Sequence, residues 1–104
     1  MRLGQLLKSV SRDYQKIQVR GISFDSRKVK KRDIFFAIKG NQTSGIKFIN
    51  EAILKGASVI ISDKINKHHN YKVPVILVKD VRKSLSEACS KFYKNLNMLP
   101  INFF

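Results

Sequence analysis

Apolar residues recur at helical spacing in three parts of this chain. The second stripe, at 48–53, ends before Gly56, which is well placed to be a left-handed C-terminal cap. Asp80 is well placed to cap the third helix at its N-terminus. The first and third stripes consist of Leu3, Leu6, Leu7 and Val10, and of Val81, Leu85, Ala88, Cys89 and Phe92. The spacing therefore predicts three amphipathic helices.

Strand patterns lie between these helices. Residues 22–24 alternate apolar and polar, as in a half-buried strand, and 34–38 is almost continuously apolar, as in a strand covered on both faces. Further apolar runs occupy 57–62 and 75–78. The predicted order is helix, strand, strand, helix, strand, strand, helix. It indicates an α/β fold, a small mixed or partly parallel sheet with flanking helices.

Polar loops follow the first two predicted strands. Asp25-Ser26-Arg27 comes directly after the first strand, and a polar segment bounded by Gly40 and Gly45 follows the second. Ligands of open α/β sheets usually bind at the carboxyl ends of strands. These two loops are therefore the candidate ligand site.

Length and apolar content limit the class of protein. A chain of 104 residues fits a single domain. No stretch approaches the roughly 20 apolar residues that span a bilayer, and Lys8 interrupts the N-terminal apolar run, so we expect a cytoplasmic protein without a membrane partner. The single cysteine, Cys89, cannot form an internal disulfide, and its helical spacing predicts that it packs in the core.

Charge adds a competing hypothesis. The chain has 21 basic and 7 acidic residues, a net charge of +14, which suits a small basic RNA-binding domain. The basic residues are mostly lysine and are spread from Arg2 to Lys94, while most phenylalanines lie in apolar runs, so nucleic acid is the second hypothesis. His68 and His69 lack acidic or cysteine companions at ligand spacing, and we expect no metal site.

An ordered set of residues runs through nearly the whole chain. It consists of Asp25-Ser26-Arg27, Val29, Asp33-Ile34-Phe35, Ala37, Gly40, Gly45, Phe48-Ile49, Ala52, Gly56-Ala57, Val73-Pro74-Val75-Ile76, Asp80-Val81-Arg82-Lys83-Ser84-Leu85 and Phe92-Tyr93. This set resembles the N-terminal domain of the Mur ligases, the ATP-dependent amino-acid-adding enzymes of peptidoglycan synthesis. Leu3-Gly4-Gln5-Leu6-Leu7 and Lys91-Phe92-Tyr93 look most like the MurE type, and the MurF type is the alternative.

The resemblance implies a division of labour between domains. Residues 1–98 would form a UDP-sugar-binding N-terminal domain, and 99–104 would begin the first strand of a truncated ATPase domain. The chain holds no phosphate loop of the family's type, so the resemblance implies no catalytic residue and no cofactor here. ATP and magnesium are expected in the full-length enzyme, together with the missing ATPase and C-terminal domains.

The resemblance also implies a binding site for the UDP end of a UDP-N-acetylmuramoyl dipeptide. Phe24 and Ser26 match family residues that contact the uridine portion, and Arg27 would add charge. Asn41, Gln42 and Thr43 match a second contact segment. An apolar side chain suits a uracil ring, and hydroxyls and amides supply directed hydrogen bonds.

Each of these assignments has a structural alternative. Phe24 would be a core residue if the alternation with Ile22 continued, and Ser26 would be a turn or cap residue. Residues 41–43 would be a solvated loop, and Asp25 and Arg27 would pair with each other or with backbone to hold the turn.

Two positions depart from the family pattern. Arg32 stands where the family usually has a glycine, so a positive φ there would strain the turn. Ser44 replaces an aspartate before the second helix and can still act as its cap.

Overall fold

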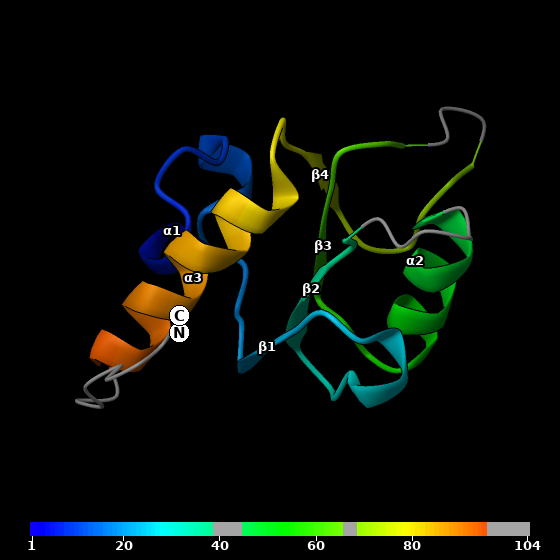
Figure 1. The fold of residues 1–104 in the computed structure, drawn as a ribbon, viewed down its shortest axis with the longest axis horizontal. Helices are drawn as coiled ribbons and strands as arrows, with labels where there is room; N and C mark the ends of the chain where they lie inside the picture. Colours follow the sequence, from blue (N-terminus) through cyan, green and yellow to red (C-terminus); the bar gives the residue numbers. More distant parts are fainter. Residues whose placement is uncertain (39–44, 66–68, 96–104) are drawn as a thin grey trace.

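The computed structural model describes residues 1–38, 45–65 and 69–95, and they form one four-stranded parallel sheet. Its order is β1-β2-β3-β4, in which Ile22 pairs with Ile34, Phe35 with Ile60, and Ile61 with Ile76. The strands are β1 (Gly21–Ser23), β2 (Asp33–Phe36), β3 (Val59–Ser62) and β4 (Val75–Leu77). Since all four strands run the same way, their carboxyl ends all lie at the same end of the sheet (Figure 1).

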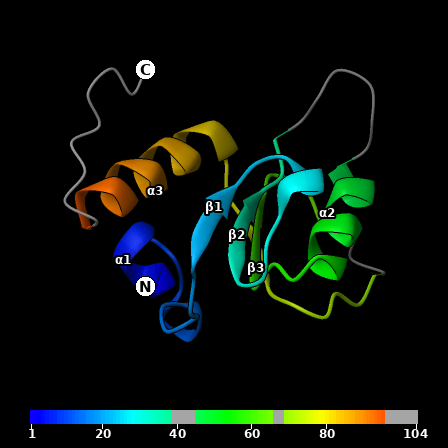
Figure 2. The ribbon, with the colours of Figure 1, turned by 90° about the horizontal axis from the view of Figure 1, so that it is seen from below.

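Helices cover both faces of the sheet. On one face lie α1 (Leu3–Leu6) and α3 (Val81–Asn95), and on the other lies α2 (Gly45–Leu54) (Figures 1 and 2). Two short 3₁₀ helices, η1 (Arg12–Tyr14) and η2 (Ser26–Lys28), complete the described elements. The fold is thus a three-layer α/β arrangement.

Each face of the sheet has its own apolar core. Ile34 and Phe36 point toward α1 and α3 and are fully buried, whereas Phe35 points toward α2 and is 2% exposed. Side chains of successive strand residues alternate between faces, and this alternation divides the continuously apolar β2 between the two cores. All four residues of β2 and of β3 are buried, as expected of inner strands of a parallel sheet.

The predicted element order is confirmed, and the sheet is wholly parallel rather than mixed. The first helix is shorter than its apolar pattern: α1 ends at Leu6, although Leu7 and Val10 are buried beyond it. Leu7 and Val10 thus fit a helical spacing in the sequence, but they are buried by irregular chain that follows the helix.

Both predicted helix caps have their expected geometry. Gly56 has φ 107° and lies two residues after Leu54, the last residue of α2. The side chain of Asp80 accepts a hydrogen bond from the Lys83 amide at 3.1 Å at the start of α3. The Ser44 cap prediction lies outside the described residues, as do the segment 99–104 and the proposed boundary after residue 98.

Arg32 adopts the left-handed conformation expected of the glycine that it replaces, with φ 69°. Its amide donates to Gly56 O at 2.7 Å, and its carbonyl accepts from the Arg20 amide at 2.8 Å. Two backbone hydrogen bonds therefore hold a conformation that an arginine does not favour.

Candidate functional site

The carboxyl end of β1 presents an exposed aromatic side chain. Phe24 is 64% exposed because β1 ends at Ser23, so the apolar–polar alternation that would have placed Phe24 in the core does not continue. The Ser23 hydroxyl is buried and donates to the carbonyl of Asp25 at 3.1 Å, which turns the chain away from the sheet. The core alternative for Phe24 is wrong.

Asp25 and Arg27 pair with each other within the turn. The Asp25 carboxylate accepts from the Arg27 backbone amide at 3.0 Å and from the Arg27 Nε and Nη2 at 3.1 and 3.0 Å. Hydrogen bonds from Arg27, first from its side chain and then from its backbone, lower the pKa of Asp25 from 3.8 to about 2. The predicted pairing is confirmed, although the Arg27 side chain itself is 80% exposed.

Ser26 begins η2 and is buried at 4% exposure. Its Oγ donates to Oε1 of Glu51 in α2 at 2.6 Å, because a carboxylate at neutral pH only accepts. Just after the end of α2, the Lys55 Nζ donates to the carbonyl of Arg27 at 2.8 Å. One side chain of α2 and one that directly follows it therefore hold the Asp-Ser-Arg turn, and the sequence pattern predicted neither contact.

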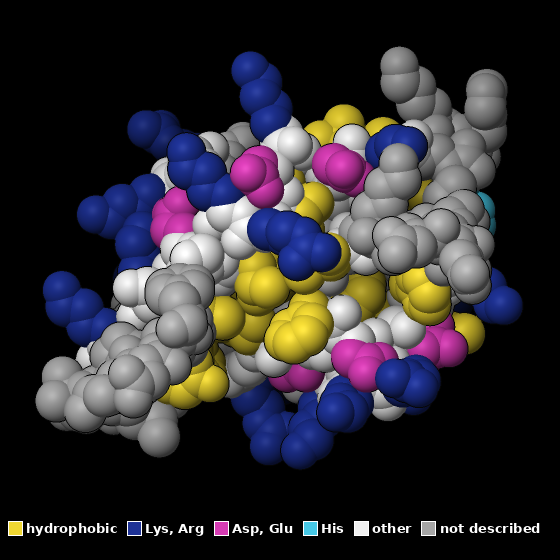
Figure 3. Space-filling view, viewed as in Figure 1, with side chains coloured by type: hydrophobic (Ala, Val, Ile, Leu, Met, Phe, Trp, Pro, Cys, Tyr) yellow, Lys and Arg dark blue, Asp and Glu magenta, His cyan; other side chains and the backbone are white. Residues whose placement is uncertain are grey.

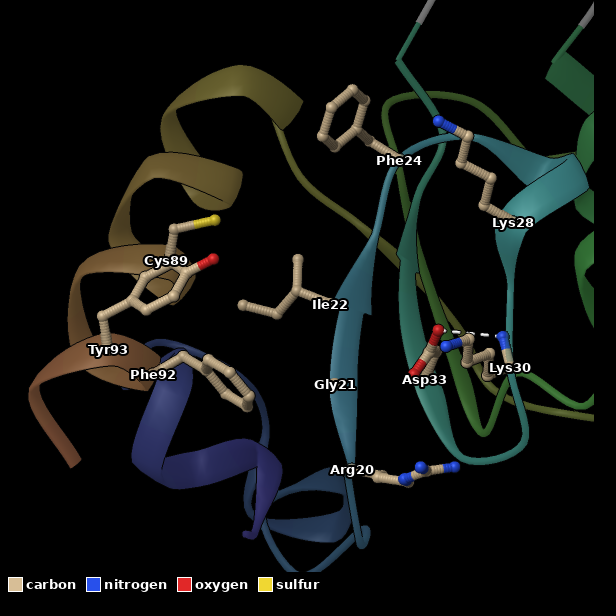
Figure 4. Close-up of a pocket in the computed structure, with 10 residues that line it drawn as sticks. All are labelled: Arg20, Gly21, Ile22, Phe24, Lys28, Lys30, Asp33, Cys89, Phe92 and Tyr93. Atoms are coloured by element: carbon tan, nitrogen blue, oxygen red, sulfur yellow. Dashed lines mark hydrogen bonds between the residues drawn. The ribbon is translucent and has the colours of Figure 1, made fainter. Parts of the chain in front are cut away.

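An open groove of about 410 Å³ runs along β1 from Arg20 to Phe24 (Figure 4). Aromatic and apolar side chains of α3 form one wall, while lysines of the β1–β2 connection lie on the other side of the strand. The lining residues are Arg20, Gly21, Ile22, Phe24, Lys28, Lys30, Asp33, Cys89, Phe92 and Tyr93. An apolar wall opposite several cations suits a ligand that carries both a flat apolar part and negative charge.

Cys89 corrects one prediction. It is half-buried and lines the groove instead of packing in the core, whereas its neighbour Ala88 is fully buried. Helical spacing placed both residues on one apolar stripe, but the structure puts Cys89 at its margin. Burial raises the pKa of the Cys89 thiol, which therefore stays protonated at neutral pH.

The predicted site residues are only partly brought together in the described structure. Phe24, Ser26 and Arg27 lie in one turn at the carboxyl end of β1, and only Phe24 of these lines the groove. Asn41, Gln42 and Thr43 lie outside the described residues. The sequence did not predict Lys28 or Tyr93 as site residues, although both line the groove. A signal existed for Tyr93, which belongs to the family resemblance and directly follows Phe92 of the apolar stripe.

Residues 1–38, 45–65 and 69–95 show neither a cluster of metal ligands nor a membrane-spanning helix. Within them, no group of three or more histidine, cysteine or acidic side chains is arranged to hold a metal ion. No helix there is long and apolar enough to cross a membrane.

Comparisons of sequence agree with the family resemblance. Residues 18–93 match the family described as "Mur ligase family, catalytic domain". A UDP-N-acetylmuramoyl-L-alanyl-D-glutamate–2,6-diaminopimelate ligase of Clostridium tetani is 51% identical over 81 residues, which cover 76% of this chain and 17% of that protein. The enzyme of the same name in Rickettsia montanensis is 46% identical over 90 residues, covering 85% of this chain and 18% of that protein.

Solved structures share the fold. The MurF ligase of Thermotoga maritima, in complex with ADP, has a TM-score of 0.58 at 27% identity, over 74% of this chain and 17% of that one. A MurF crystal structure from Acinetobacter baumannii has a TM-score of 0.66 at 22% identity, over 89% of this chain and 20% of that one, and it shows the fold alone. The chain spans between 16% and 20% of the length of the curated relatives.

Proposed function

This chain belongs to the Mur ligase family, and we propose that it binds the UDP end of a UDP-N-acetylmuramoyl dipeptide for a ligase of the MurE type. The curated relatives are named as ligases that join 2,6-diaminopimelate to UDP-N-acetylmuramoyl-L-alanyl-D-glutamate, and this favours the MurE type over the MurF type. The reaction belongs to peptidoglycan synthesis in the cytoplasm. In this proposal ATP and magnesium bind to parts of the ligase other than this chain.

The exposure of Phe24 is the observation that carries the proposal. An aromatic ring that is 64% exposed at the carboxyl end of a parallel strand offers a flat apolar surface where open α/β sheets bind ligands. Stacking of a base on such a ring contributes about 1–3 kcal/mol. Lys28 lines the same end of the groove and supplies positive charge for a diphosphate (Figure 4).

The turn that follows gives directed contacts in this proposal. Ser26 donates its proton to Glu51, so its oxygen can act only as an acceptor toward a second partner, such as an N–H or O–H of the uridine. Arg27 adds charge beside it, and Asn41, Gln42 and Thr43 supply amides and a hydroxyl from the loop after β2.

Titration calorimetry with UDP-N-acetylmuramoyl-L-alanyl-D-glutamate tests the proposal. Phe24→Ala removes the stacking surface, and we expect on the order of tenfold weaker binding. Leu77→Ala is the matched control, since Leu77 is another large apolar side chain, 54% exposed, on the opposite edge strand β4. It should leave the affinity unchanged.

The polar contacts are tested in the same way. Ser26→Ala and Thr43→Ala should each weaken binding while circular dichroism shows an intact fold. Unchanged affinity in all three site variants would remove the proposed site. Tighter binding of generic RNA than of the UDP-sugar, with a steep log–log dependence on salt, would favour the nucleic-acid hypothesis instead.

A further inference from the structure

The outer edge of β1 pairs with no other strand in the described part of the chain. β1 is the first strand in the sheet order, and its one neighbouring strand among the described elements is β2. Edge strands present backbone N–H and C=O groups that can pair with another extended chain. The outer edge of Gly21–Ser23 is therefore a candidate docking surface.

The chain already uses the continuation of this edge for strand pairing. Just before β1, the Val19 amide donates to Met1 O at 2.7 Å, and the Leu3 amide donates to Ile17 O at 2.8 Å. Arg2 and Gln18 form an antiparallel bridge between the same two segments. An extended segment thus lies beside residues 17–19, and the groove along β1 begins where this pairing stops.

The two sides of β1 differ in chemistry, as Figure 4 shows. Cys89, Phe92 and Tyr93 of α3 lie on one side together with Ile22. Lys28 and Lys30 lie on the other. Successive side chains of an added strand would point alternately to these two sides. A strand with alternating apolar and charged residues fits this arrangement.

The groove has an excess of positive charge. Arg20, Lys28 and Lys30 line it, and an adjoining hollow of about 360 Å³ adds Arg32. None of these four forms an ion pair with another residue of the described ranges. The acid that faces the groove, Asp33, is buried and accepts a hydrogen bond from the Lys30 amide at 2.9 Å. Around the apolar patch in the middle of this face, both basic and acidic side chains are visible (Figure 3).

We propose that the outer edge of β1 binds an extended acidic peptide segment in which apolar residues alternate with aspartate or glutamate. The peptide would add a strand to the sheet, with apolar side chains against α3 and acidic ones toward Lys28 and Lys30. Gly21 has no side chain that could obstruct a strand at this edge. A larger residue would be crowded there, because a Cβ on Gly21 would lie 3.0 Å from Oδ1 of Asp33. A second copy of the chain is disfavoured as occupant because each copy carries a net charge of +14.

Amide NMR on the ¹⁵N-labelled chain tests this proposal with a short acetylated peptide of alternating glutamate and isoleucine. We expect shift changes and slower hydrogen exchange at Gly21–Ser23. A peptide of the same composition with its isoleucines grouped together should bind at least about tenfold more weakly. As an added strand it could not direct all its isoleucines toward α3 and all its glutamates toward Lys28 and Lys30. A lysine–isoleucine peptide should not bind.

Reversing the charge of lysines in the protein provides a second test of the peptide proposal. The double variant Lys28→Glu, Lys30→Glu should weaken binding of the alternating peptide by about tenfold or more, and Lys64→Glu, an exposed lysine outside the groove, should not. Equal binding of both glutamate peptides would overturn the proposal. So would unchanged β1 amides, stronger binding of oligouridylate at those amides, or a dimer forming through β1 without peptide.

This inference does not depend on the UDP-sugar proposal. If Ser26→Ala lost UDP-sugar binding and kept the peptide response, both proposals would stand. If the wild-type chain bound the peptide and not the UDP-sugar, only the proposed function would fail.

Discussion

The two sides of β1 differ in what lies beside the strand. Hydrogen bonds hold the turn on the α2 side, whereas the α3 side borders an open groove. On the α2 side, Ser26 is bonded to Glu51, and the carbonyl of Arg27 is bonded to Lys55. On the α3 side, Phe92 and Tyr93 are half-buried and face an open groove. The α2 side fixes the shape of the Asp-Ser-Arg turn, whereas the α3 side leaves apolar surface available to a ligand.

The residues that hold the turn in place therefore differ from the residues that a ligand in the groove would contact. A polar turn that is held by Glu51 of α2 and by Lys55 just after it keeps one geometry before a ligand arrives, which lowers the ordering cost of binding. Partly exposed aromatic groups contribute mainly when something covers them. Substitutions in the core on the α2 side and at Glu51 should therefore affect stability most, and substitutions of exposed side chains that line the groove should affect binding most.

The largest contrast is expected between two phenylalanines. Phe35→Ala empties a site that is 2% exposed in the α2-side core, and we expect a loss of about 3–5 kcal/mol in the free energy of unfolding. Phe92→Ala removes a half-buried ring beside the groove and should cost about half as much or less. Urea denaturation of both variants measures the difference. Equal losses of unfolding free energy in the two variants would contradict the distinction between the closed core on the α2 side and the open groove on the α3 side.

A smaller effect is expected at the contact between α2 and the turn. Glu51→Ala leaves the buried hydroxyl of Ser26 without its partner, and we expect a loss of about 1–2 kcal/mol in unfolding free energy. Glu51→Gln keeps an acceptor oxygen and is the matched control, with a loss below about 1 kcal/mol. Thermal unfolding compares the two variants. If the alanine variant were no less stable than the glutamine variant, Glu51 would not hold the turn.

The smallest effect concerns pH, because the Asp25–Arg27 pair is exposed. Arg27 lowers the pKa of Asp25 to about 2 in the folded chain, against an ordinary value of 3.8. A carboxylate with a lowered folded pKa stabilises the fold above its unfolded pKa, so this contribution should be lost as pH falls from about 4 to about 2.

Carboxyl ¹³C NMR titration checks this prediction residue by residue. Arg27→Gln should return the pKa of Asp25 toward 3.8. Lys28→Gln is the control and should change it less, since the charge of Lys28 is the smallest cause of the shift. A similar rise in both variants would show that general positive charge, and not the direct hydrogen bonds, lowers this pKa.

Much of the fold follows from local patterns in the sequence. Apolar spacing predicts, in order, the three α-helices and four strands of the described residues, and Gly56 and Asp80 mark helix ends through their own backbone and side-chain chemistry. The length of α1 could not be predicted, because burial of Leu7 and Val10 depends on packing against other elements. The wholly parallel pairing likewise depends on contacts between distant segments.

The candidate site is less accessible to sequence reasoning. The pairing of Asp25 with Arg27 could be predicted because the two residues are two positions apart. The contact of Ser26 with Glu51 joins residues 25 positions apart and requires the α2 layer to be in place. Phe24 shows the same limit, since its exposure depends on where β1 ends.

UDP-sugar binding at the carboxyl ends of β1 and β2 is tested most directly by amide NMR mapping of the labelled chain during titration with UDP-N-acetylmuramoyl-L-alanyl-D-glutamate. We expect the largest shift changes at residues 24–27 and 41–43. Amides on β4 at the opposite edge of the sheet should remain unchanged. Saturable shifts confined to other parts of the chain, or no shifts at millimolar ligand, would contradict it.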